Sequence, residues 1–378
     1  MERIDGLFFE LLQTAVERRD KLSAIPTEQE WQDLYDMSKK QSLLGVASYG
    51  LERLPKEQLP ERKLLLRWMN NVAKIEQRNK LTTAVSYGLS QFFDKEGFHT
   101  CILKGQTNQV NYGEKLKYKR SSGDVDIWIT PKDKNCAHPV KYTIDYLTEK
   151  NLVVSLCYLH VEMKSVKKVP VEVHFRPSFM NAPSKNRRFL KFFSPIEDCT
   201  CKKDIGNDLS LPALKTDYDV IFQMNHVYRH LIDEGVGLRQ VLDYYMLLKT
   251  WHGQHEFSRE KVMEIVGSLG MRRFAGALMY VLKEVFAMPS DWMVCEPSEA
   301  DGRFLLSEIM LAGNFGHKDP RMATLKVEKG KTSFQISRAY RRFTRNLRFF
   351  SSYPEEVVWE PVIRLVHFWW RKFKLWRF

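Results

Sequence analysis

Apolar residues recur along this chain with two different periods, and the period changes near residue 97. In residues 1–95 the apolar positions are spaced three and four residues apart, which is the period of a helix with one buried face. The clearest example runs from Glu61 to Phe93. We therefore predict a helical N-terminal segment over residues 1–95.

Short apolar runs replace this pattern after Gly97, and they predict strands at residues 98–103, 125–130, 156–163 and 169–175. The polar residues between the last two runs predict a hairpin that turns at residues 165–168. Helical spacing over residues 140–152 separates the second run from the third. This order predicts an α+β core over residues 96–204, in which a small mixed β-sheet packs against helices.

Helical periodicity returns at Thr216 and predicts a helical domain over residues 205–330. The remaining segment, residues 331–378, contains eleven Lys and Arg residues against three Glu. Most of the chain's net charge of +13 therefore lies at this end.

The end of this basic segment is also aromatic. A helix that starts at Pro361 would place four apolar residues on one side, namely Val362, Val366, Trp369 and Phe373. Basic residues would occupy the rest of its surface. Such a helix suits an anionic membrane surface or nucleic acid as its partner, and packing on its own domain is the simpler alternative.

Composition sets wide limits on function. A chain of 378 residues is longer than one domain of ordinary size. Its positive charge favours partners that carry phosphate or carboxylate groups. The six scattered cysteines fit a reduced cytosol. The sequence lacks an uncharged apolar stretch of about eighteen residues, and its first residues resemble an amphipathic helix more than a signal peptide. We expect a cytoplasmic protein that the basic segment could bring to the membrane periphery.

Two carboxylates lie two residues apart around the second predicted strand, at Asp124 and Asp126. Alternation along a strand places both on the same side, while Val125 and Ile127 face the core. Neighbouring carboxylates repel each other, and a divalent cation such as Mg²⁺ would neutralise them. A solvated strand end is the simpler explanation of the pair when it is taken alone.

A glycine turn precedes this pair, and further acidic residues follow it. Lys104 and Gly105 come directly after the first predicted strand and are expected to open a helix, where backbone amides and the lysine could hold a triphosphate. An ordinary strand-to-helix turn is the alternative. Glu172 and Glu162 each lie between apolar neighbours on the predicted hairpin, as a third metal ligand or a general base would. Periodicity alone does not say which of the two faces the metal.

In this order, the glycine turn, the Gly123-Asp124-Val125-Asp126 sequence and the later strand resemble the DNA polymerase beta-like nucleotidyltransferase superfamily. Residues 103–105, 120–129 and 171–174 are similar to the bacterial family labelled uncharacterised nucleotidyltransferase, and the resemblance extends over about residues 60–250. One departure is at the turn, where the wider superfamily has Gly-Gly or Gly-Ser and this chain has Gly105-Gln106.

The resemblance implies roles for individual residues. Asp124, Asp126 and Glu172 take the places of the metal-binding and catalytic carboxylates, and Glu172 is preferred to Glu162 because His174 follows it by two residues. The implied nucleotide-binding residues are Lys104, Gly105, Gln106, Ser122 and Gly123. The residues expected to line an acceptor pocket are His174, His230, Arg239 and Asp243. A surface pair at i,i+4 spacing explains the last two equally well.

The implied reaction transfers a nucleoside monophosphate from an NTP to an unidentified small molecule, sugar or protein, with release of pyrophosphate. Mg²⁺ is the expected cofactor and Mn²⁺ its substitute. A second hypothesis makes RNA the acceptor, held by the basic segment. A third is a catalytically silent nucleotide-binding scaffold, against which the retention of three carboxylates speaks.

Two other patterns are weaker. His226 and His230 have the spacing of paired zinc ligands on a helix. They lack the H-E-x-x-H signature, so we prefer a structural role. Cys199 and Cys201 have no second cysteine pair nearby, and metal binding is not expected there.

Overall fold

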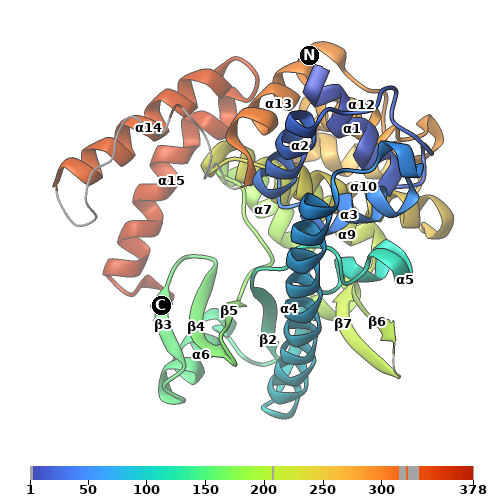
Figure 1. Ribbon diagram of the computed structural model, residues 1–378. Coiled ribbons are helices and arrows are strands. Elements are labelled where there is room, and N and C mark those ends of the chain that lie inside the picture. Colours follow the sequence, from blue (N-terminus) through green and yellow to red (C-terminus); the bar gives the residue numbers. More distant parts are fainter. Residues whose placement is uncertain (1–2, 207, 315–320, 322–331, 378) are drawn as a thin grey trace. The chain divides into compact units, whose positions relative to one another are not determined.

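The computed structural model describes residues 3–206, 208–314, 321 and 332–377. The chain forms two compact units, of which the first combines residues 1–74 with 223–358 and the second combines residues 75–222 with 359–378. Figure 1 labels many of their helices and strands. The first unit thus combines residues 1–74 of the first predicted segment with residues from 223 onwards of the third, and residues 359–378 belong with the predicted core. The predicted boundary between residues 330 and 331 lies outside the described residues.

The first unit is helical. Its elements are α1 (Arg3–Ala15), α2 (Glu28–Lys40), α3 (Leu44–Arg53), η1 (Lys56–Gln58), the start of α4 (Arg62–Lys95), most of α9 (Thr216–Asp233), α10 (Leu238–Gln254), α11 (Arg259–Ser268), α12 (Arg272–Phe286), η3 (Ser290–Trp292), α13 (Glu299–Ala312), α14 (Thr332–Phe350) and the start of α15 (Pro354–Lys372). Helix α2 begins where the sequence provides a capping box, because Thr27 accepts from the Glu30 amide and Glu30 accepts from the Thr27 amide.

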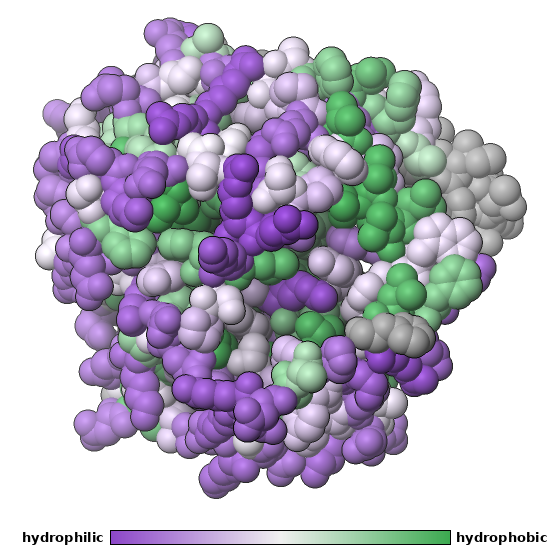
Figure 2. Space-filling view, turned by 180° about the vertical axis from the view of Figure 1, so that it is seen from behind, coloured by the Kyte–Doolittle hydropathy of each residue, from purple (hydrophilic) through white to green (hydrophobic). Residues whose placement is uncertain are grey.

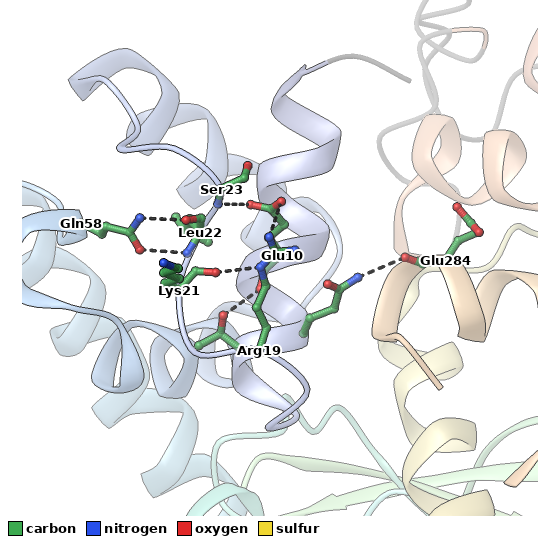
Figure 3. A network of polar contacts seen from close by, with 9 residues as sticks. Glu10, Arg19, Lys21, Leu22, Ser23, Gln58 and Glu284 are labelled. Atoms are coloured by element: carbon green, nitrogen blue, oxygen red, sulfur yellow. Dashed lines mark hydrogen bonds and ion pairs between the residues drawn. The ribbon is translucent and has the colours of Figure 1, made fainter. Parts of the chain in front are cut away.

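Hydrogen bonds hold the segment that follows α1 (Figure 3). Glu10 Oε2 accepts from the Ser23 amide at 2.8 Å, and Arg19 lies 3.0 Å from the same carboxylate. The Gln58 side chain both donates to and accepts from the backbone of Leu22. These bonds satisfy backbone groups of an irregular segment that has no secondary structure to pair them.

The second unit contains the sheet. In chain order after α4 its elements are β1 (Phe98–Ile102), η2 (Asn108–Tyr112), α5 (Gly113–Leu116), β2 (Val125–Pro131), α6 (Pro139–Glu149), β3 (Val153–Leu156), β4 (His160–Val166), β5 (Val169–His174), α7 (Pro183–Phe192), α8 (Ile196–Cys199), β6 (Thr200–Gly206), β7 (Leu209–Leu214) and, at the end of the chain, η6 (Leu375–Arg377). Within the described residues the sheet has seven strands in the order β3-β4-β5-β2-β1-β7-β6. Strand β2 pairs parallel to β5 and antiparallel to β1, so the sheet is mixed.

The predicted α+β class, with a mixed sheet and helices at both ends of the chain, is confirmed. Two details differ. The predicted strand 156–163 is two strands, because the chain leaves β3 after Leu156 and enters β4 at His160. Strands β6 and β7 were not predicted, and they take up the first residues of the segment 205–330 that was assigned to a helical domain. Helix begins at Thr216, where the helical periodicity was predicted to return. Pro212 lies inside β7, and a proline in a short apolar run argues against a strand because it cannot donate to the ladder.

One face of the sheet forms the core of the second unit. Val125, Ile127 and Ile129 alternate along β2 and are buried in one cluster with apolar residues of α4 and α6. Alternation therefore turns Asp126 to the opposite face. Hydrophilic side chains cover most of the surface drawn in Figure 2, with apolar groups gathered between them. Among the described helices, none has the length and apolarity needed to span a bilayer.

Candidate active site

Polar side chains of three adjacent strands meet on the face of the sheet opposite the core. Asp126 on β2 stands in register with Glu172 on β5. Glu172 in turn stands opposite Glu162 on β4, and His174 stands opposite His160. Residues in register on neighbouring strands project from the same face. The two glutamates that the sequence left as alternatives therefore share one face, and Glu172 is the one next to Asp126.

Three carboxylates converge at the start of β2. Asp124 directly precedes the strand and Asp126 lies within it, buried at 1% exposure. One ligand oxygen from each of Asp124, Asp126 and Glu172 lies within 4.8 Å of the others. Hard oxygen donors at this separation fit a divalent cation of the Mg²⁺ type.

Lys104 supplies positive charge beside the carboxylates. Strand β1 ends at Ile102, and the Leu103 amide donates to the Asp126 carbonyl at 3.0 Å. This bond brings Lys104 Nζ within 3.2 Å of Asp126 Oδ1. Burial would lower the pKa of Lys104, but attraction to the three carboxylates outweighs it and raises the pKa above its ordinary value. The lysine is therefore charged at neutral pH.

His174 links two of the acids. Its Nε2 lies 3.2 Å from Asp126 Oδ1 and 3.4 Å from Glu172 Oε2. Burial would lower the pKa of His174, but hydrogen bonds to these two carboxylates outweigh it and raise the pKa. With a hydrogen on Nε2, the ring donates a hydrogen bond to Asp126 Oδ1.

The same contacts lower the pKa values of Asp126 and Glu172. Burial would raise the pKa of Asp126, but attraction to Lys104 and the His174 hydrogen bond hold it below its ordinary value. Burial likewise opposes ionisation of Glu172, yet the His174 hydrogen bond and attraction to His160 lower its pKa to about 2. Both acids are therefore carboxylates at neutral pH.

His160 belongs to this cluster, and the sequence analysis missed it. Its Nδ1 lies 3.3 Å from Glu172 Oε2. His160, Glu172 and His174 form a second group whose ligand atoms lie within 4.8 Å of one another. The sequence could not show that His160 lies opposite His174, because the hairpin has a register shift between Met163 and Val166. Without that bulge a tight turn at residues 167 and 168 would set Glu162 against Val173, and the histidines would not be opposite each other.

The turn after β1 differs from the prediction. Gly105 has φ of +73°, a conformation that favours glycine, but no long helix follows it. Turn residues lead instead into the short η2 and α5. The Gln106 side chain is buried, donates to Ser122 Oγ at 2.8 Å and accepts from Ser86 Oγ at 3.1 Å. Gln106 thus ties the turn to α4 and to the segment before Asp124, and Gly123 in that segment is exposed.

Three residues predicted for the acceptor pocket, His230, Arg239 and Asp243, belong to the other unit, so that role stays a prediction. The interpretation of Arg239 and Asp243 as a surface pair is wrong, because Asp243 is buried. The rings of His226 and His230 are 4.3 Å apart, and no group of three ligands among the described residues includes them. Cys199 and Cys201 are free thiols, and burial raises the pKa of Cys199 to about 12.

The family described as uncharacterised nucleotidyltransferase matches residues 27–287 of the chain. The chain belongs to this family. The match to this nucleotidyltransferase family extends at both ends beyond residues 60–250, the range expected from the sequence.

One solved structure is similar to this nucleotidyltransferase-family chain, an antigenic nucleotidyltransferase-like protein from Paracoccidioides brasiliensis. The two are 11% identical with a TM-score of 0.34, over 59% of this chain and 96% of the other. No curated protein matches the chain.

Proposed function

We propose that this protein is a metal-dependent nucleotidyltransferase that uses Asp124, Asp126 and Glu172. In the reaction, the bond between the α-phosphorus of an NTP and its bridging oxygen to the β-phosphorus breaks. A new bond forms from that phosphorus to an acceptor oxygen, whose proton passes to water, and pyrophosphate leaves. The observation that carries the proposal is the convergence of three carboxylates within 4.8 Å on the central strands of a nucleotidyltransferase-family protein.

The donor set fits the cofactor. Asp124, Asp126 and Glu172 would hold Mg²⁺ through carboxylate oxygens. When bound, the ion would offset the repulsion between the acids and stabilise the negative charge that develops on the phosphates. Carboxylate oxygens also suit Mn²⁺, which favours Mn²⁺ as a working substitute for Mg²⁺.

The surrounding residues would prepare the site for a nucleotide. The positively charged Lys104 contacts Asp126 and could also attract the phosphates of a bound triphosphate. Gly105 lets the backbone of the turn approach a phosphate closely. His174 contacts both Asp126 and Glu172 and would hold the two carboxylates in place.

The low pKa of Glu172 separates two roles that the sequence left together. A carboxylate with a pKa of about 2 is a weak base at neutral pH and accepts a proton poorly. It is well suited to hold a cation, because it stays ionised. We therefore assign Glu172 to metal binding rather than to proton transfer.

Transfer of label tests the function. The purified chain would be incubated with each α-³²P-labelled NTP, Mg²⁺ and a cell extract separated into small molecules, protein and RNA. Label that becomes attached to one fraction, only when Mg²⁺ or Mn²⁺ is present and not with the Asp126→Asn variant, supports the proposal. We expect it in the small-molecule or protein fraction, and label in the RNA fraction supports RNA as the acceptor. No transfer, together with NTP binding that raises the melting temperature, would favour the silent scaffold.

A further inference from the structure

The C-terminal end of α15 presents different chemistry on its two sides. One side packs on the sheet unit, where the His367 ring stacks on Tyr158 at 4.0 Å between centroids. Trp370 is buried and lies 5.5 Å from the Tyr158 ring and 6.1 Å from the Phe175 ring. His367 and Trp370, three residues apart on the helix, therefore anchor this end of α15 to its own unit.

The other side is exposed and apolar. The side chains that share this exposure are Val362, Leu365, Val366, Phe368, Trp369, Phe373 and Leu375. They include all four residues that the sequence placed on one helix side. Trp369 and Phe373 stack at 5.0 Å with parallel rings, and Phe373 is 59% exposed. Monomeric proteins rarely leave so many adjacent large apolar residues in water without a binding role.

Positive charge accompanies this apolar side. Residues 361–378 contain five Lys and Arg residues and no Asp or Glu. Arg364 is hydrogen-bonded to Glu360 at 2.6 Å, whereas Arg371, Lys372 and Lys374 are exposed near the apolar residues. Lys372 Nζ lies over three rings of the exposed side, 5.1 Å from that of Trp369.

We propose that this side of α15 docks on an anionic phospholipid bilayer. Aromatic and aliphatic side chains would enter the interface between headgroups and acyl chains, and the basic residues would face anionic headgroups. Nucleic acid explains the basic and aromatic residues through stacking, but leaves Val362, Leu365 and Val366 without a role. A second copy of the chain would bring like charges together. The proposal concerns where the protein acts and does not depend on its catalytic activity.

Vesicle flotation with the full chain tests this proposal. The vesicles are phosphatidylcholine alone, or phosphatidylcholine with about a third phosphatidylglycerol. We expect flotation with the anionic vesicles at low salt, weaker flotation at high salt, and a blue shift of tryptophan fluorescence on binding.

Three variants separate the contributions. The double variant Trp369→Glu with Phe373→Glu alters only exposed side chains, so it should keep the melting temperature and lose at least about tenfold in vesicle binding. Lys372→Glu with Lys374→Glu should remove the preference for anionic lipid. Val154→Glu, at an exposed position on β3, is the matched control and should bind as the wild type does. Absence of flotation, equal binding to both vesicles, or equal binding by the double variant would overturn the proposal. Binding of a single-stranded RNA without vesicle binding would assign the surface to nucleic acid.

Discussion

Glu172 and Glu162 stand directly opposite each other on β5 and β4, and both project from the polar face of the sheet. They differ in the strand that lies on the other side of each of them. Glu172 is in register with Asp126 on β2 and shares a cluster with Asp124, whereas Glu162 is exposed and next to the edge strand β3. Position in the strand order, rather than local sequence, thus distinguishes the two acids.

We expect Glu172→Gln to lower turnover at least ~100-fold and Glu162→Gln to change it little, because only the first removes a charge from the carboxylate cluster. Steady-state rates of the two folded variants at saturating Mg²⁺ check this. Glu162→Gln is the matched control, since it makes the same change on the same face. The reverse ranking would place the site on the wrong strand.

Asp124→Asn and Asp126→Asn should both abolish transfer but differ in stability. Asp126 is buried against Lys104 and His174, so its neutralisation removes the negative charge that both side chains contact and should cost about 1–3 kcal/mol of unfolding free energy. Asp124 is only partly buried, and its neutralisation relieves repulsion at little cost. Urea unfolding without metal measures both. A more stable Asp126→Asn protein would show that repulsion outweighs these contacts.

The low pKa of Glu172 predicts a dependence of apo stability on acid. Because folding lowers this pKa from 4.5 to about 2, its contribution is present above pH 4.5 and is lost as the pH falls towards 2. The contribution is on the order of 1–3 kcal/mol, reduced by partial exposure of the side chain. The difference in unfolding free energy between the wild type and Glu172→Gln should therefore shrink between pH 5 and pH 3. A difference that stays constant over this range would mean that the pKa is not lowered.

The sequence predicted the features of the site that depend on local pattern. Alternation at Val125 and Ile127 was enough to place Asp126 on the polar face, and the resemblance preferred Glu172, which lies in register with Asp126. The contribution of His160 could not be predicted, because it depends on a bulge that shifts the hairpin by one residue. Likewise, β7 was hidden by Pro212, and its pairing with β1 through Ile102 and Ala213 joins segments more than a hundred residues apart.

The central claim is that Asp124, Asp126 and Glu172 hold the cation that nucleotide transfer requires. Its most direct test is a crystal of the protein with Mn²⁺ and an NTP analogue that cannot be cleaved after the α-phosphorus, measured at the manganese absorption edge. The account predicts an anomalous peak within roughly 2–2.5 Å of oxygens from all three carboxylates, with a phosphate oxygen of the analogue as a further ligand. A nucleotide bound elsewhere, or a peak that none of the three carboxylates contacts, would contradict it.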